Sequence, residues 1–560
     1  MFRKTTSFWR IVVLLFGLCL ILVWWAGCSA DLKKAIQASR PVTKEPPLPP
    51  PYLCTGFPQV VIVSGTDQEM GRQYGEQAAA AIIHNLAIFK SRLYDAYGSE
   101  TIARDMQVWD YYLTKYDPAY QNWLLGIMEG CREKGYDVSY TDLILLVVYP
   151  TQLWARPKTP YPEETKTAWL ATDLKATPAG QYHSCNSFAA TGSMTPDGKT
   201  IHAITSMAET EMMDNIILMA FPADGFPFVA QTYAGRVSSN FAMNARGFAW
   251  TMTAILSDSP AWGIPPEVYF HYLAQKVASP TEALKYLEST PKGGVTGGFI
   301  LTDASGDILV YEGTSDHFHL RRPGAMGESG LFVVQTNHLV HPSLSIYNPK
   351  WLAEIATFAR YDTVFQYLKE APRGTVDFAQ AKKILASDDW YDATKAKWMR
   401  NQPGAKEISN SHTSVGQGIF LPGESTAYFQ AGTPSGIGLP AFATGEYVKI
   451  KLADQPGKVV RQAERDALEM YWQVRDAFEH DLNAKAPFLT VAASGDLRSK
   501  LDQAFSAYSL GLDRASFASL QSDENARIRL WAEAMSHYAK AQLYAGMAKT
   551  ALLKLRESNR

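Results

Sequence analysis

Short runs and regular spacings of hydrophobic residues divide the chain into strands, helices and turns. Residues 60–63 are consecutively apolar and precede a glycine-containing turn, a pattern that predicts a short buried strand. From about Asp67, apolar residues recur at every fourth position, which is the spacing of one helical face. Further along, the pattern predicts a helix that ends near Gly135 and another that begins at Ser139 or Thr141.

The middle of the chain has the alternation of β-strands. Residues 182–204 predict two strands joined by a Pro-Asp-Gly turn, and residues 297–313 predict a second hairpin. The apolar run at 330–339 predicts a further strand, and 350–371 has the apolar spacing of a helix. The polar, proline-bearing segment 156–184 predicts an exposed linker. Strands accompanied by helices on this scale predict an α+β protein.

The N-terminal part predicts export and a membrane anchor. Basic residues precede the apolar run 11–25, which has the plan of a signal peptide over residues 1–27. The following "AGC" is similar to the end of a bacterial lipobox, which would make Cys28 the lipidated first residue of the mature protein. Trp25 departs from the aliphatic residue usual there, and an uncleaved signal anchor is the alternative. Residues 28–54 are proline-rich and predict a semi-rigid tether that holds the body at the cell envelope.

The C-terminal part, residues 456–560, predicts amphipathic helices. Their apolar faces favour packing on the preceding core or a small helical appendage. Their mixed charges do not favour a role on a membrane surface.

Composition excludes several classes of function. The 53 basic and 55 acidic residues nearly cancel, so no nucleic-acid partner is expected. The sequence contains no Gly-x-Gly-x-x-Gly, Walker, His-Glu-x-x-His or Cys-x-x-Cys motif, and its histidines lack the spacing of metal ligands. Neither a nucleotide cofactor nor a metal site is therefore expected.

The cysteines of the body raise a chemical question. Cys54, Cys131 and Cys185 are an odd number in an oxidising compartment, so a disulfide between Cys54 and Cys131 would leave Cys185 as a lone thiol. A lone thiol there is exposed to oxidation, which favours a use for its reactivity. The alternative is that Cys185 is a small buried hydrophobic residue in a strand.

Six motifs occur in one order along the chain: "GTDQEMGRQYGE", "GIMEGCREKGYDVSYTDLILL", "SCNSFAATGSMTPDGK", "FAMNARGFAWT", "QTNHLV" and "FARYDTV". In this order they resemble the acyl-coenzyme A:6-aminopenicillanic acid acyltransferase family (peptidase C45-like). That family belongs to the N-terminal-nucleophile (Ntn) hydrolases and is similar to choloylglycine hydrolases, acid ceramidase and phospholipase B-like proteins. The resemblance implies a four-layer αββα sandwich, which we expect within residues 55–455, with a C-terminal helical extension.

The resemblance also implies self-cleavage between Ser184 and Cys185. Cys185 would then carry a nucleophilic thiol and a free α-amine, and an amine that titrates near ~8 can act as the base for a thiol near ~8.5. The two cleavage products would remain together as a heterodimer. The implied activity is hydrolysis or transfer of an acyl group at an amide bond, with a small N-acylated or peptide substrate and no cofactor.

Three further site residues are carried over from the family. Asn337 falls at an oxyanion-hole amide, Asn244 at another asparagine near the site, and Arg360 at an arginine that holds the catalytic geometry. Each has a structural alternative: the asparagines are also typical of turns, and Arg360 of a solvated helix face.

One departure from the family concerns two charged positions. Relatives have an arginine and an aspartate where this chain has Ile204 and Met207. Glu209, Glu211 or Asp214 would supply the missing carboxylate, or the site works without it, or activity is lost.

The resemblance therefore leaves alternatives open. One is an Ntn dipeptidase, and another is an inactive binding scaffold in the cell envelope. A papain-like site in which His338 activates Cys185 is disfavoured, because the local Cys-Gly-x-Cys-Trp context is absent.

Overall fold

The structure is a computed structural model that describes most of the chain after residue 58. The described residues are 59–162, 165, 184–207, 215–255, 260–328, 330–349, 356–387, 389–400, 414–430 and 445–559. The expected signal peptide and tether, including Cys28 and Cys54, lie outside the described residues, and so do Glu209, Glu211 and Asp214.

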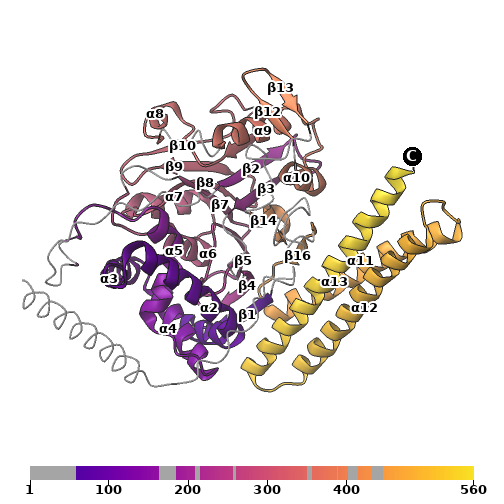
Figure 1. Ribbon diagram of the computed structural model, residues 1–560, viewed down its shortest axis with the longest axis horizontal. Coiled ribbons are helices and arrows are strands. Elements are labelled where there is room, and N and C mark those ends of the chain that lie inside the picture. The colour runs from indigo at the N-terminus through magenta and orange to yellow at the C-terminus, as the bar shows by residue number, and fades with distance from the viewer. Residues whose placement is uncertain are drawn as a thin grey trace, which may run out of the picture. The chain divides into compact units, whose positions relative to one another are not determined.

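Two large sheets form the centre of the protein (Figure 1). The first has eight strands in the order β1 (Gln59–Gly65), β4 (Asn215–Pro222), β5 (Phe228–Tyr233), β6 (Phe241–Asn244), β7 (Ala249–Ile255), β8 (Thr296–Thr302), β9 (Ile308–Gly313) and β10 (Phe318–Arg321). The second has six, in the order β11 (Phe332–Gln335), β2 (Ser184–Gly192), β3 (Gly198–Met207), β14 (Ser414–Leu421), β15 (Thr426–Gln430) and β16 (Val448–Lys451). The pair β1–β4 is parallel, and the other paired strands are antiparallel. A small hairpin pairs β12 (Trp390–Asp392) with β13 (Lys397–Met399).

Helices lie on the outer faces of both sheets. Over the eight-stranded sheet pack α2 (Asp67–Tyr97), α3 (Ser99–Tyr116), α4 (Pro118–Glu133), α5 (Tyr140–Trp154), α6 (Pro266–Lys276) and α7 (Pro280–Ser289). Over the six-stranded sheet pack α9 (Thr357–Glu370) and α10 (Phe378–Leu385). The short α8 (Pro342–Ser345) and the 3-10 turn Pro422–Glu424 lie in connections, and α11 (Pro456–Asn483), α12 (Val491–Ser519) and α13 (Glu524–Ser558) complete the chain.

The alternation of side chains along β1 shows how the layers are held together. Val61 and Val63 pack in the core shared with α2 to α5, whereas Val60 and Ile62 pack in the core between the two sheets. Successive residues of a strand point to opposite faces, so one buried strand contributes to two cores. The resulting order of layers is helices, sheet, sheet and helices, which confirms the predicted αββα sandwich.

Four glycines of the first two sequence motifs lie at a close helix crossing. A Cβ atom at Gly71 of α2 would lie 2.2 Å from Trp123 O of α4, and one at Gly130 of α4 would lie 2.0 Å from Arg72 O. Helices can approach this closely only where side chains are absent. The predicted helix starts are also confirmed, since Thr66 and Ser139 cap α2 and α5 through capping boxes.

The C-terminal helices pack on the core and close the edges of both sheets. Ser536 of α13 lies 3.1 Å from Val60 N and 3.3 Å from Val60 O of β1. Gln542 accepts a hydrogen bond from Lys449 N of β16 at 2.8 Å. Edge strands expose unpaired main-chain groups, and these side chains satisfy some of them. The helical extension begins at Pro456, as predicted.

Two sequence-based expectations differ from the described structure. The expected exposed linker is not exposed at its beginning, because Arg156 is buried and its guanidinium pairs with Asp105 of α3 at 2.5 Å. Cys131 is buried as a free thiol whose sulfur lies 3.9 Å from Gly75 O, so the structure gives no support to its pairing with Cys54.

Candidate active site

Cys185 is the second residue of β2 and lies between the two sheets. It pairs with Ser206 of β3 and is 3% exposed. Ser187, two residues on, hydrogen-bonds Thr251 of the opposite sheet, so this face of β2 points toward β7. Asn186 points to the other face, toward α9. The alternation of β2 therefore directs the thiol into the protein interior and its neighbour toward a helix.

The main chain of Cys185 is held by two side chains from elsewhere in the chain. Its N–H donates to Asn337 Oδ1 at 2.6 Å, and its carbonyl oxygen accepts from Arg360 Nη1 at 2.6 Å. Arg360 Nη1 also donates to Asn186 Oδ1 at 2.6 Å, and Nη2 donates to Asn337 Oδ1 at 3.0 Å. Three residues expected from the family, Cys185, Asn337 and Arg360, thus form one hydrogen-bonded cluster beside the predicted scissile bond. Asn186, the residue after Cys185, belongs to the same cluster.

The Asn337 amide is oriented by its surroundings. Its oxygen accepts from Cys185 and Arg360, and its Nδ2 donates to Ala254 O at 2.8 Å. The main-chain N–H of Asn337 donates to Thr357 Oγ1 at 2.9 Å, at the first turn of α9. An amide nitrogen carries two hydrogens, so one remains beyond the bond to Ala254. The predicted oxyanion role of Asn337 therefore remains a prediction, and its acceptor role toward Cys185 is a further property.

Arg360 brings a positive charge into a fully buried position. It is 1% exposed, on the first turns of α9. Burial lowers the pKa of its guanidinium, and the nearby Cys185 acts in the opposite direction. An arginine remains protonated under these conditions, so Arg360 places a positive charge beside Cys185.

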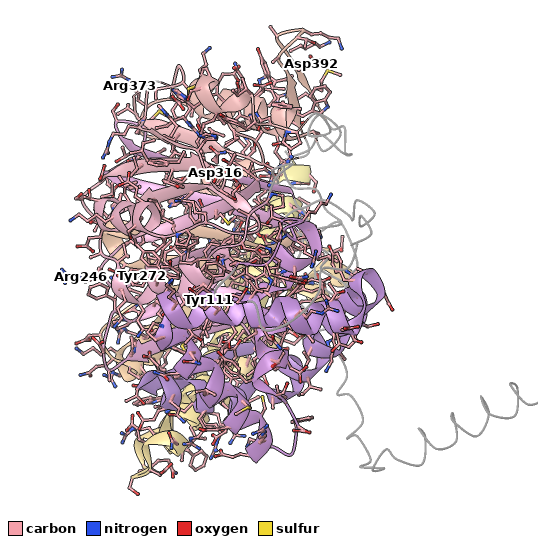
Figure 2. The ribbon with its side chains drawn as sticks, turned by 90° about the vertical axis from the view of Figure 1, so that its left-hand side faces the viewer. Tyr111, Arg246, Tyr272, Asp316, Arg373 and Asp392 are labelled. Carbon is pink, nitrogen blue, oxygen red and sulfur yellow. The ribbon has the colours of Figure 1, made fainter. Side chains whose placement is uncertain are left out.

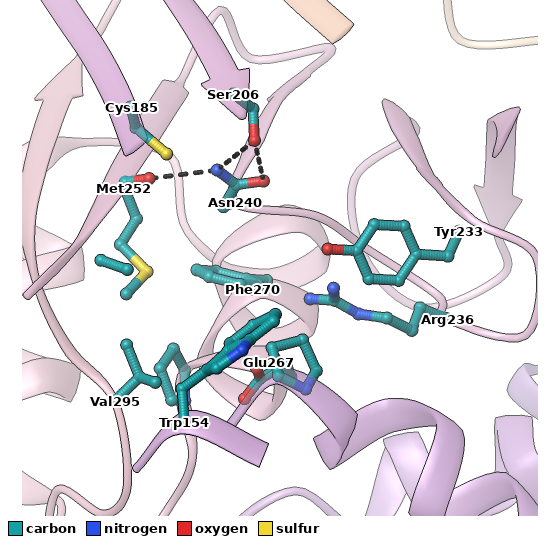
Figure 3. A pocket seen from close by; sticks show the side chains of 13 residues that line it. Trp154, Cys185, Ser206, Tyr233, Arg236, Asn240, Met252, Glu267, Phe270 and Val295 are labelled. Carbon is teal, nitrogen blue, oxygen red and sulfur yellow. Dashed lines mark hydrogen bonds between the residues drawn. The ribbon is translucent and has the colours of Figure 1, made fainter. Parts of the chain in front are cut away.

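A small cavity of about 50 Å³ lies beside the Cys185 side chain (Figure 3). Its walls come from α5, α6 and both sheets: Pro150, Trp154, Cys185, Ser206, Tyr233, Arg236, Asn240, Met252, Ala254, Pro266, Glu267, Phe270 and Val295. Asn240 Nδ2 donates to Ser206 Oγ and to Met252 O, both at 3.1 Å, which fixes the amide at the cavity wall. The cavity is thus mostly apolar with a few placed polar groups, as ligand sites usually are.

The sequence did not predict the polar residues that line the cavity beside Cys185, among them Arg236, Glu267 and Tyr233. Arg236 is 4% exposed and lies with its guanidinium carbon 4.8 Å from the centre of the Tyr233 ring. Glu267, near the start of α6, has its pKa raised by burial, while Arg236 lowers it. Burial also raises the pKa of Tyr233 to about 12, an effect that Arg236 opposes. No motif or spacing marks these residues, because only the tertiary fold brings Glu267 of α6 to the end of β5, where Tyr233 and Arg236 lie.

Ile204 and Met207 do not carry charge into the site. Ile204 packs in the apolar core between the sheets, and Met207 pairs with Ser184 at the end of the β2–β3 ladder. In the part of the chain that the structure describes, the acidic and basic groups at the cavity are Glu267 and Arg236.

Asn244 lies at the end of β6 and makes only structural contacts. Its Nδ2 donates to Ala274 O and Val277 O, and its oxygen accepts from the main chain of Arg246 and Phe248. Asn240, four residues earlier, lines the cavity, and four strand residues span roughly 13 Å. The contacts of Asn244 fit the turn role that the sequence left open as its alternative.

His338 does not activate Cys185 in this structure. Its Nδ1 lies 3.1 Å from both Thr336 Oγ1 and Thr357 Oγ1, and its ring packs on Phe358. Burial lowers its pKa to about 3, so the imidazole is neutral at ordinary pH. These contacts give no support to a papain-like pair.

The described residues contain neither a metal-ligand cluster nor a membrane-spanning helix. No three His, Cys, Asp or Glu side chains among them are grouped as metal ligands would be. Within the same residues, no helix has the length and apolar character needed to cross a membrane.

The layers and the site together define the class of protein. Facing sheets between helical layers, with a cysteine at the start of an inner strand, are the α+β architecture of the Ntn hydrolases. The model of the family described as acyl-coenzyme A:6-aminopenicillanic acid acyl-transferase matches residues 195–382, which confirms the resemblance seen in the motifs. This part of the chain is therefore similar to that acyltransferase family.

Individual relatives are distant. An uncharacterized protein of Archaeoglobus fulgidus is 25% identical over 306 residues, covering 48% of this chain and 47% of that protein, so the chain spans about half of this relative's length. The Caenorhabditis elegans ortholog of N-acylethanolamine-hydrolyzing acid amidase is 16% identical, with a TM-score of 0.31, over 43% of this chain and 93% of that chain. A mutant conjugated bile acid hydrolase from Clostridium perfringens is 10% identical, with a TM-score of 0.29, over 44% of this chain and 89% of that chain.

Proposed function

We propose that the protein is a cysteine amidohydrolase or acyltransferase whose nucleophile, Cys185, becomes N-terminal through self-cleavage. The observation that carries this proposal is the convergence of Asn337 and Arg360 on the main chain of Cys185, beside a cavity that its side chain lines. A buried structural cysteine needs no such support, since strand pairing alone satisfies its main chain.

The maturation step uses the atoms that this cluster holds. The Cys185 sulfur attacks the Ser184 carbonyl carbon, the C–N bond to Cys185 breaks, and the thiol proton passes to the departing nitrogen. Water then opens the thioester, which leaves a carboxylate on Ser184 and an α-amine on Cys185. Because β2 begins at Ser184, the scissile bond lies at the first peptide of the strand.

After cleavage the same nitrogen becomes the base. Asn337 Oδ1 already accepts a hydrogen bond from this atom, so it orients the amine while leaving the nitrogen lone pair for the thiol proton. Arg360 holds the carbonyl of Cys185 and its charge favours the thiolate. Attack of the thiolate on a substrate amide forms an acyl thioester and releases the amine, and water or an acceptor amine completes the reaction.

Export and anchoring complete the proposal. The signal-like residues 1–27 and the lipobox-like Cys28 support a lipid-anchored protein of the cell envelope, with the membrane contacted through the lipid. The two cleavage products are proposed to stay together as a heterodimer. Supporting this, β1 precedes the cut yet pairs with β4 after it, inside one core.

Substitution at two cysteines tests the proposal. Cys185→Ala is expected to abolish both self-cleavage and amide turnover, because no other group replaces the thiol. The matched control is Cys131→Ala, which removes another buried thiol, one that hydrogen-bonds only Gly75 O among the contacts described. The control is expected to be cut and active, and a panel of N-acyl amides and peptides serves as the assay. An active Cys185→Ala protein would refute the proposal.

A further inference from the structure

Arg236 is a buried charge without a hydrogen-bonded partner in the described structure. Its side chain is 4% exposed and its Nε is buried without an acceptor. Figure 3 shows its guanidinium directed into the cavity that Cys185 lines. The rings of Tyr233 and Phe270 lie 4.8 Å and 5.9 Å from the guanidinium carbon, and such contacts do not replace hydrogen bonds to five N–H groups.

Glu267 is not a hydrogen-bonded partner of the Arg236 guanidinium in the described structure. Both of its carboxylate oxygens face Thr151, whose Oγ1 lies 3.1 Å and 3.4 Å from them. No ion pair within 4.0 Å joins Glu267 to Arg236 among the described contacts. Burial raises the pKa of Glu267, and Arg236 opposes this shift. The guanidinium thus lacks an anion at hydrogen-bonding distance.

A buried guanidinium is costly unless an acceptor pairs with it, and its planar fork matches a carboxylate with two parallel hydrogen bonds. We propose that Arg236 binds the carboxylate of the substrate, so that the substrate is an N-acyl amino acid and not a neutral amide. This inference rests on the proposed function of Cys185.

The size of the cavity limits where that carboxylate lies in the substrate. Cys185 and Arg236 line the same space of about 50 Å³, so only a few bonds separate the reacting amide from the carboxylate. An α-amino acid as the leaving group meets this condition. Trp154 and Phe270 provide apolar contacts for the rest of the molecule. The thiolate takes the acyl group as a thioester, and the amino acid leaves with its nitrogen protonated.

A matched pair of substrates tests the assignment. N-octanoylglycine carries the carboxylate, and N-octanoylglycinamide replaces it with a neutral amide of nearly the same shape. We expect kcat/KM of the wild-type protein to be at least about 10-fold higher for the acid. In Arg236→Gln the ratio of the two kcat/KM values is expected to fall to about 1, mainly because the KM of the acid rises. In Arg236→Lys the ratio is expected to lie between the wild-type value and that of Arg236→Gln.

Arg246→Gln is the control for loss of a charge. Arg246 lies exposed on the turn after β6 (Figure 2) and does not line the cavity. Its substitution is expected to keep the wild-type ratio. Because each variant is compared on two substrates, a general loss of structure lowers both rates and leaves the ratio unchanged.

A binding measurement distinguishes failure of this inference from failure of the proposed function, because it does not require turnover. Calorimetry with each compound is expected to show that the wild-type protein binds N-octanoylglycine more tightly, and that Arg236→Gln loses this preference. That result supports the carboxylate site even if neither compound is turned over. Turnover of both compounds with an equal ratio in wild type and Arg236→Gln, equal affinity for both, or no binding of N-octanoylglycine would overturn the assignment.

Discussion

The two sides of Cys185 differ in how completely their polar groups are paired. On the main-chain side, Asn337 and Arg360 bond to each other and to the Cys185 N–H and carbonyl. On the side-chain side, the Arg236 guanidinium has no described hydrogen bond, and Glu267 is turned to Thr151. Both Nη groups of Arg360 are hydrogen-bonded in the main-chain cluster, whereas no hydrogen bond is described for either Nη group of Arg236. Hydrogen bonds of this kind fix geometry, and an unpaired guanidinium leaves a place for a ligand. The difference separates the groups that position the nucleophile from those that meet the substrate.

Removing Arg360 is expected to have the largest effect on the stability of the fold. Arg360→Met leaves acceptors of Cys185, Asn186 and Asn337 buried without a donor, which is expected to lower the free energy of unfolding by about 3 kcal/mol. Displacement of the nucleophile is expected to slow self-cleavage by about 100-fold. Denaturant unfolding and the time course of cleavage measure the two effects.

A control on the same helix makes this result specific. Lys369 is exposed in the last turn of α9, and Lys369→Met is expected to cleave at the wild-type rate. Equal cleavage by Arg360→Met and wild type would show that the paired side of Cys185 does not position it.

Asn337 tests whether the paired side also acts in catalysis. Asn337→Ala is expected to lower turnover about 100- to 1,000-fold, because it removes a donor used in the transition state. Asn337→Asp keeps an acceptor for the Cys185 nitrogen but has no N–H. If Asn337 stabilises the oxyanion, turnover of the aspartate variant falls as far as that of the alanine variant. Wild-type turnover by Asn337→Asp would limit Asn337 to orienting the amine.

Substitution of the buried His202 tests whether its imidazole is neutral in the folded protein. Its ring nitrogens lie 2.9 Å from Thr302 Oγ1 and 2.8 Å from Thr251 Oγ1, and burial lowers its pKa to about 3 from an ordinary value near 6.5. Between these values the unfolded chain takes up a proton that the folded protein does not. The free energy of unfolding is therefore expected to fall with decreasing pH, by at most about 1.4 kcal/mol per pH unit.

Urea unfolding at pH 7, 6 and 5 in the uncut Cys185→Ala background measures this slope. His202→Gln is expected to reduce the slope, and His317→Gln, at an exposed position, is expected to leave it unchanged. His338, whose pKa is lowered to about 3 as well, contributes a slope of its own in every variant. An unchanged slope in His202→Gln would mean that His202 is protonated in the folded state.

The sequence predicted the features that depend on local pattern. The helix start near Asp67, the cap at Ser139 and the helix that contains Arg360 follow from short-range spacing. The position of Asn244 was not resolved, because an asparagine at the end of a strand looks the same whether it faces a site or a turn.

The rest depends on contacts between distant segments. Arg156 is buried only because Asp105, on another helix, pairs with it. Arg236, Glu267 and Asn240 line one cavity because the end of β5 and the starts of β6 and α6 lie near the same place, and none of these residues has a motif. The resemblance to the family therefore pointed to Asn337 and Arg360, whereas only tertiary packing brings the cavity residues Arg236, Glu267 and Asn240 together.

The N-terminal sequence of the purified protein tests the central claim most directly. Under denaturing, reducing conditions the account predicts two pieces that remain together in native buffer, with the larger one starting at Cys185 and ending at Arg560. Cys185→Ala is expected to give one uncut chain. A single unprocessed wild-type chain in fully folded protein, or a cut at any other bond, would contradict the assignment of Cys185 as an N-terminal nucleophile.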